Sequence, residues 1–179
     1  MSADLGAGFE DSYWFFCLQD GLGARLEGMS QAISDLDVLL SSMEPMLHDG
    51  VYAYCVVADD FDFSRLVPVA TVREAEGLTL VVPEEQALDA GLKVVFRAAW
   101  ISLMVHSDLQ AVGLTAAFSN ALGRAGISCN VVAGAFHDHI FVPEEKAQQA
   151  LDALLTLQQK AKSLETDPGS DQATELQKV

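Results

Sequence analysis

Basic residues are scarce in this sequence. Lys and Arg together number 10, against 26 Asp and Glu, and the formal net charge is −16. A chain with this charge repels the phosphates of nucleic acids and the anionic headgroups of membranes. We therefore expect neither nucleic acid nor a membrane surface among its partners.

Cysteine is also scarce. Cys17, Cys55 and Cys129 are odd in number, lie far apart and include no CxxC pair. That pattern argues against a disulfide framework or a cysteine-based zinc site and fits reduced, buried thiols. It predicts a cytoplasmic protein, and we expect no metal or other cofactor.

Long apolar runs are missing as well. The longest uncharged stretches, at 98–105 and 109–123, fall short of the roughly 20 apolar residues that a membrane helix needs. The apolar patch Tyr13–Leu18 follows acidic residues and is a poor signal peptide. Half of the residues are nevertheless apolar, which is enough for the core of one medium domain or two small ones.

The two ends of the chain differ from its middle. Residues 1–28 combine several glycines with an isolated aromatic cluster, and we assign them to an N-terminal extension outside the predicted units. Residues 161–179 are polar and contain Asp167-Pro168-Gly169-Ser170, which breaks regular structure. They have little apolar surface to offset the entropy of ordering, so we expect a disordered tail.

Between these ends, periodicity and turn residues predict a first set of elements. Apolar residues recur at helical spacing from Leu36 to Met43, and a β-branched and aromatic run begins at Val51. Glu74-Ala75-Glu76-Gly77 is typical of a hairpin turn. The predicted elements are a helix at 35–43, a strand at 51–58, a polar loop at 59–68, hairpin strands at 68–73 and 78–82, and a helix at 83–91.

The second half repeats this order more clearly. Strands are predicted at 99–105, 127–133 and 136–142, and helices at 109–125 and 143–157. The tripeptide Pro-Glu-Glu opens the last helix of each half, at Pro83 and at Pro143. The repeated βαββα order predicts an internal duplication of about 60 residues.

Four segments resemble a family of tandem ACT-domain proteins of unknown function. They are residues 71–80 (TVREAEGLTL), 106–117 (HSDLQAVGLTAA), 125–134 (AGISCNVVAG) and 137–143 (HDHIFVP), and the resemblance spans about residues 30–158. It implies an α+β fold of two ferredoxin-like βαββαβ units, whose antiparallel sheets are covered by helices on one face. The expected units are 29–92 and 93–160.

The resemblance also implies regulatory binding of an amino acid or a related metabolite at an interface between paired domains. Backbone amides where a strand turns into a helix can bind a carboxylate, and Gly113 would let a ligand approach the backbone. Alternatively, Gly113 permits close helix packing and Asn130 satisfies a strand edge. The predicted ligand contacts are His106, Ser107, Leu109, Val112, Gly113, Leu114, Thr115, Asn130, Val131, Val132, His137 and His139.

His137 and His139 are two residues apart on a predicted strand, so both side chains are expected on one face of the sheet. A metal would need a third ligand, for which His106 or His48 is available, but two histidines at this spacing are a weak motif. We predict no metal site. The pair also carries an alternative hypothesis, an enzyme that uses His137 and His139 as acid and base.

The first hairpin has a charged cluster that could contact a zwitterion or a partner subunit. The commoner explanation is a solvated hairpin with local ion pairs. The residues concerned are Thr71, Arg73, Glu74 and Glu76.

The sequence therefore favours a regulatory, small-molecule-binding homodimer without catalytic activity. A second hypothesis is a structural dimerisation module without a small ligand, in which exposed sheet edges pair.

Overall fold

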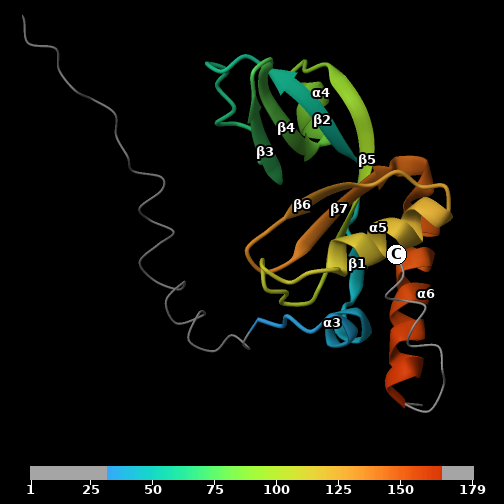
Figure 1. Ribbon diagram of the computed structural model, residues 1–179. Coiled ribbons are helices and arrows are strands. Elements are labelled where there is room, and N and C mark those ends of the chain that lie inside the picture. The colour runs from blue at the N-terminus through green and yellow to red at the C-terminus, as the bar shows by residue number, and fades with distance from the viewer. Residues whose placement is uncertain (1–31, 167–179) are drawn as a thin grey trace, which may run out of the picture. The chain divides into compact units, whose positions relative to one another are not determined.

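The computed structural model describes residues 32–166, and side chains as far as residue 164 (Figure 1). The predicted extension at 1–28 and the end of the predicted tail, 167–179, lie outside the described residues. The helices are α3 (Leu36–Ser42), α4 (Glu84–Asp89), α5 (Leu114–Arg124), the 3₁₀ turn η1 (Glu144–Lys146) and α6 (Ala147–Thr166).

The strands form one seven-stranded antiparallel sheet. Its order is β3-β4-β2-β5-β7-β6, and β1 also pairs with β5. The strands are β1 (Pro45–Leu47), β2 (Tyr52–Val57), β3 (Ala70–Glu74), β4 (Gly77–Pro83), β5 (Val94–Leu103), β6 (Asn130–Ala133) and β7 (Asp138–Pro143).

The ten-residue strand β5 joins the two repeats. Its beginning pairs with β2, where Phe96 lies opposite Tyr54, and its end pairs with β7, where Ile101 lies opposite Ile140. Arg97 on β5 donates to Glu84 at 2.6 Å and to Glu144 at 3.4 Å. These two glutamates hold the same place in the repeated Pro-Glu-Glu, so one arginine connects the equivalent helix starts.

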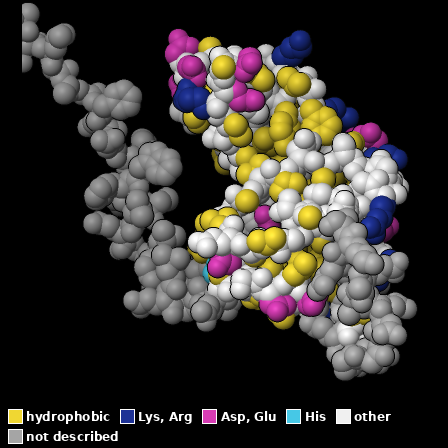
Figure 2. Space-filling model, viewed as in Figure 1, with side chains coloured by type: hydrophobic (Ala, Val, Ile, Leu, Met, Phe, Trp, Pro, Cys, Tyr) yellow, Lys and Arg dark blue, Asp and Glu magenta, His cyan; other side chains and the backbone are white. Residues whose placement is uncertain are grey.

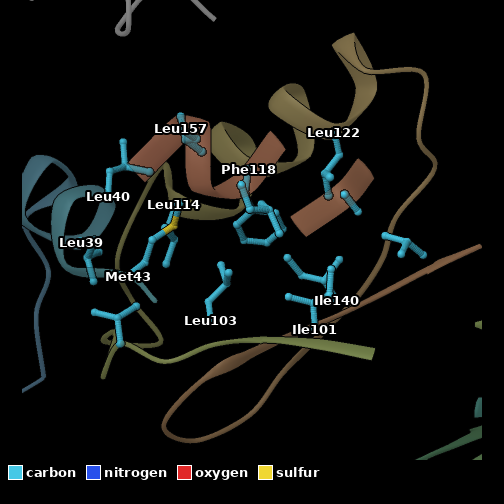
Figure 3. Close-up of a cluster of buried hydrophobic side chains, with 14 of the residues drawn as sticks. Leu39, Leu40, Met43, Ile101, Leu103, Leu114, Phe118, Leu122, Ile140 and Leu157 are labelled. Carbon is cyan, nitrogen blue, oxygen red and sulfur yellow. The ribbon is translucent and has the colours of Figure 1, made fainter. Parts of the chain in front are cut away.

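Helices cover one face of the sheet, as expected. Residues of α3, α5 and α6 pack on β5 and β7, with Phe118 and Ile101 fully buried between them (Figure 3). A second cluster forms under α4, where Ala87 packs with Cys55 and Leu80. At about 25 cal/mol per Å² of apolar surface removed from water, burial of these side chains is the main source of stability.

The opposite face carries aromatic residues instead. Tyr52, Tyr54, Trp100 and Phe141 form a cluster that contains no residue of a described helix, and Phe96 packs against it. Tyr54 meets Phe96 and Phe141 edge to face, with ring centroids 5.7 Å apart in both pairs. Burial raises the pKa of Tyr54 to about 12. Figure 2 shows hydrophobic side chains gathered in mid-view, where β2 and β5 run.

The helix α3 and the strand β1 pack with elements of the second repeat. Leu39, Leu40 and Met43 of α3 belong to the same buried cluster as Leu154 of α6. The strand β1, which the sequence did not predict, pairs with β5 at Leu47↔Ile101. The predicted unit boundary at 92/93 therefore separates segments that share one core.

Several segments differ from the predicted elements. The strand expected at 99–105 runs from Val94 to Leu103, and the strand expected at 127–133 begins at Asn130. The helix expected from residue 109 begins at Leu114, because residues 108–111 form a turn with a hydrogen bond from the Ala111 amide to the Asp108 carbonyl of 2.8 Å. Residues 161–166, expected in a disordered tail, continue α6. Ala161 follows Leu154 and Leu157 on the buried stripe and is 6% exposed, so packing holds these turns in the helix.

The hairpin and the polar loop were predicted correctly. Residues 58–69 contain no helix or strand, and β3 and β4 pair as far as Glu74↔Gly77. Gly77 has a φ of +142°, and a Cβ there would lie 2.5 Å from the Val57 carbonyl oxygen. Only glycine fits this turn, for both reasons.

Candidate functional site

The loop from β5 to α5 is held by the segment before α3. The Ile33 amide donates to the His106 carbonyl, and the Asp108 amide donates to the Ile33 carbonyl, both at 2.9 Å. These bonds pair residue 33 with Ser107 in a parallel bridge. The loop that carries most of the predicted ligand contacts is thus anchored at both sides of Ser107.

Gly113 ends this loop and caps α5 without a side-chain hydrogen bond. The first intrahelical bond runs from the Ala117 amide to the Gly113 carbonyl, at 2.8 Å. The amides of the first turn, from Leu114 to Ala116, precede that bond and carry the positive end of the helix dipole. The exposed Thr115 lies in this turn. The helix dipole at this end of α5 favours an anion, but Asp35 and Asp37 of the neighbouring α3 segment lie beside it.

The predicted contacts on β6 divide between the two faces of the sheet. Val131 pairs with Ile140 and packs against the core under the helices. Val132 pairs with His139 and packs with the aromatic cluster. Asn130 is exposed, and its side-chain amide donates to the Phe141 carbonyl at 3.4 Å. A ligand on one face could therefore contact the side chains of Asn130 and Val132, but not that of Val131 as well.

Near the start of β7, His137 and Asp138 contact the β5–α5 connection. His137 Nδ1 lies 3.2 Å from the Val105 carbonyl oxygen, and Ser107 Oγ donates to Asp138 at 3.5 Å. Burial raises the pKa of Asp138, and the Ser107 hydrogen bond partly opposes that rise. His106 meets Phe136 edge to face, with centroids 5.4 Å apart. This end of the sheet brings together His106, Ser107 and His137, three of the residues predicted as ligand contacts.

His139 belongs to a different cluster, which the sequence analysis missed. Its Nδ1 accepts a hydrogen bond from Trp100 Nε1 at 3.2 Å and lies 2.8 Å from Ser102 Oγ. Ser102 Oγ also lies 2.8 Å from Nε2 of His48, whose ring stacks on Trp100 at 3.5 Å. Since an indole nitrogen only donates, Nδ1 of His139 must be unprotonated in this arrangement.

Burial, more than any other influence, lowers the pKa of His48 and of His139. The neighbouring charge of Asp49 partly opposes the shift at His48, as Asp138 does at His139. Among the residues that the structure describes, no group of three or more His, Cys, Asp or Glu could hold a metal ion. The sequence signal for this cluster was weak, because His48 and Ser102 lie 54 residues apart.

The charged cluster of the first hairpin lies apart from the β5–α5 loop. Thr71, Arg73, Glu74 and Glu76 are all exposed. Arg73 forms an ion pair with Asp59, and Glu74 accepts from the Thr79 hydroxyl. These are the local surface interactions of a solvated hairpin.

A cavity of about 460 Å³ lies between α3, α5 and α6. Of the predicted ligand contacts, Val112 and Gly113 line it, and the others do not. The remaining lining residues are Asp35, Leu36, Asp37, Leu40, Ala116, Ala117, Asn120, Ala121, Arg124 and Leu157.

Comparison with known proteins agrees with this architecture. An ACT domain model matches residues 31–99, and a second ACT domain model matches residues 95–156. Protein VC0802 from Vibrio cholerae, a protein of unknown function described as a possible transport protein, is 52% identical. That match covers 69% of this chain and 95% of that chain, with a TM-score of 0.63. The chain belongs to the ACT-domain family.

More distant structures share the fold of this tandem ACT-domain protein. The regulatory subunit of aspartate kinase from Thermus thermophilus is 12% identical, with a TM-score of 0.53 over 66% of this chain and 97% of that chain. Protein Atu0741 from Agrobacterium tumefaciens is 14% identical, with a TM-score of 0.50 over 65% of this chain and 89% of that chain. No curated protein matches the sequence.

ACT domains are regulatory modules, so family membership supports a regulatory, ligand-binding role in general. None of the helices in the part of the chain that the structure describes is long and apolar enough to cross a membrane.

Proposed function

We propose that this tandem ACT-domain protein is a homodimeric regulatory protein that binds an amino acid or a related metabolite and has no catalytic activity of its own. The ACT match over residues 95–156 carries the proposal, because it includes the β5–α5 loop and β6. The ligand would lie between the β5–α5 loop and the edge strand β6, close to the exposed Asn130. The hydrogen bonds to Ile33 support this site by keeping the loop in place before a ligand binds.

The dimer would form through strand edges. The strands β3 and β6 end the strand order, so each pairs with only one neighbour in the sheet. An unpaired edge is a template for a strand of a second copy. The cluster of His106, Ser107 and His137 lies beside the β6–β7 hairpin, so pairing along β6 would bring a partner close to the proposed ligand contacts.

A thermal-shift screen with the twenty amino acids tests the proposal. A ligand at about one hundred times its Kd stabilises the native state by about 2.7 kcal/mol, which raises the Tm of a protein of this size by several degrees. Asn130→Ala should reduce the shift, because it removes an exposed polar contact on β6. The matched control is Gln148→Ala, which removes an exposed amide on α6 and should leave the shift unchanged.

Light scattering after size-exclusion chromatography measures the oligomeric state in the same samples. A dimer whose Tm no amino acid raises would favour the alternative of a structural dimerisation module. A monomer would contradict the edge-paired homodimer.

A further inference from the structure

The cavity between α3, α5 and α6 has the size of a ligand pocket. Its volume of about 460 Å³ falls within the roughly 300–1,000 Å³ that such pockets occupy. Leu36 and Leu40 of α3 line one side, and Leu157 of α6 lines another. Figure 3 shows Leu40 and Leu157 at the α3 and α6 side of the core. These side chains give the cavity an apolar wall.

The cavity stays open because α5 presents small residues to α3. Ala116, Ala117 and Ala121 line the cavity along α5, and Gly113 lines it at the start of that helix. Val112 also lines the cavity, yet it is 85% exposed. A ligand lying along α5 would remove this valine from water and gain the free energy of that burial.

The two ends of the cavity differ in charge. The acidic residues Asp35 and Asp37 flank Leu36. Leu36 lies against the start of α5, because a Cβ atom added to Gly113 would be 2.8 Å from Leu36 Cδ2. Arg124 ends α5, an 11-residue helix that is about 16 Å long at 1.5 Å per residue. The acidic end therefore lies at the start of α5 and the basic end at its last residue.

Helix dipoles reduce these charges without reversing them. The starts of α3 and α5 each contribute about half a positive charge beside the two carboxylates, and the end of α5 contributes about half a negative charge beside Arg124. By this estimate the acidic end keeps about one negative charge and the basic end about half a positive charge.

We propose that this cavity binds a short apolar peptide with free ends. The peptide ammonium group would lie near Asp35 and Asp37, its carboxylate would pair with Arg124, and its side chains would pack over the alanines of α5. At 3.3 to 3.6 Å per extended residue, a peptide of about four or five residues spans the length of α5. A single amino acid is too short to reach both ends. This site is thus separate from the β5–α5 loop site of the proposed function, except at Val112 and Gly113.

Nuclear magnetic resonance titration of the full chain with the synthetic peptide Ala-Leu-Leu-Ala tests this site. We expect saturable shifts of the backbone amides of Ala116, Ala117 and Asn120. The same peptide with an acetylated N-terminus and an amidated C-terminus should bind about three- to tenfold more weakly, because it loses both charges. Equal binding of the two peptides, or shifts confined to residues outside the cavity, would overturn the proposal.

Two exposed substitutions separate the two ends. Arg124→Gln should weaken binding of the free peptide about three- to tenfold and leave binding of the amidated peptide unchanged. Asp37→Asn should weaken binding of the free peptide about three- to tenfold and leave binding of the acetylated peptide unchanged. We choose Asp37 rather than Asp35 because the side chain of Asp35 caps α3. Lys93→Gln, which removes one exposed positive charge just before β5, is the control for Arg124→Gln and should leave binding unchanged. If Lys93→Gln weakened binding equally, the effect of Arg124→Gln would be one of net charge, which would contradict the site.

Alanine as a free amino acid separates this proposal from the proposed function. Shifts caused by free alanine at residues 106–111 and 130–132 report on the loop site alone, because none of these residues lines the cavity. If free alanine causes no such shifts, the proposed loop site loses support and the peptide result is unaffected. If the peptide does not bind, the cavity proposal is wrong and the proposed loop site is unaffected.

Discussion

Gly113 lies against Leu36, and a side chain at position 113 would displace the end of this leucine. A Cβ on Gly113 would come 2.8 Å from Leu36 Cδ2, and the φ angle of Gly113 is +107°. The close approach joins α3 to the start of α5, in agreement with the sequence-based alternative that this glycine permits close helix packing. Loss of ligand binding on substitution of Gly113 would therefore not identify a ligand contact.

Gly113→Ala should destabilise the protein by about 1–3 kcal/mol, because alanine is strained at this φ angle and its Cβ meets Leu36. Urea unfolding measures the change. Gly123→Ala is the matched control, since Gly123 lies within α5 and a Cβ there meets nothing within 4 Å. That control should stabilise the protein by about 0.5–1 kcal/mol. Equal effects of the two substitutions would contradict the packing role of Gly113.

The stability of the protein should fall as the pH drops below about 6.5. Folding lowers the pKa of His48 and His139, so the unfolded chain takes up protons that the folded protein does not bind. The stabilisation by the neutral imidazoles is complete above the pKa that these histidines have in the unfolded chain. It is lost as the pH falls toward their lower pKa values in the folded protein. Urea midpoints at about pH 7.5, 6.5 and 5.5 measure this loss.

His139→Phe is the control for the pH dependence. It removes one titrating imidazole and should reduce the slope of stability against pH between about pH 6.5 and 5.5. An unchanged slope would assign the pH dependence to other groups.

Ala161→Asp should cost about 1–3 kcal/mol, because it places a carboxylate where α6 packs against the core. Ala161 is 6% exposed. Its neighbour Lys160 is exposed, so Lys160→Asp introduces the same side chain with an expected change within about 0.5 kcal/mol. Thermal and urea unfolding compare the pair. A neutral effect at both positions would show that α6 does not pack beyond residue 160 in solution.

Cys129 should react with a thiol reagent before Cys55 does. Cys55 is fully buried, and burial raises the pKa of its thiol, whereas Cys129 is half-buried. The measurement uses a Cys17→Ser background and follows modification by mass spectrometry with and without urea. Modification of Cys55 at the rate of Cys129 under native conditions would contradict its burial under α4.

The sequence by itself determined the elements whose cause is local. The hairpin at Gly77 was predictable because a tight turn needs the positive φ angle that glycine supplies, and the starts of α4 and η1 were marked by Pro83 and Pro143. The duplicated order followed from these local patterns, whereas the ACT resemblance rests on the matched segments 71–80, 106–117, 125–134 and 137–143.

Tertiary structure decided which of these elements share a core and a site. The packing of α3 on α6, the pairing of β1 with β5, and the contacts of His48 and Ser102 with His139 join residues far apart in the chain. The cavity likewise exists only because α3 lies beside the small residues of α5. Such contacts depend on the complementary shapes of surfaces that meet after folding, and a one-dimensional pattern of apolar and polar residues does not encode which surfaces meet.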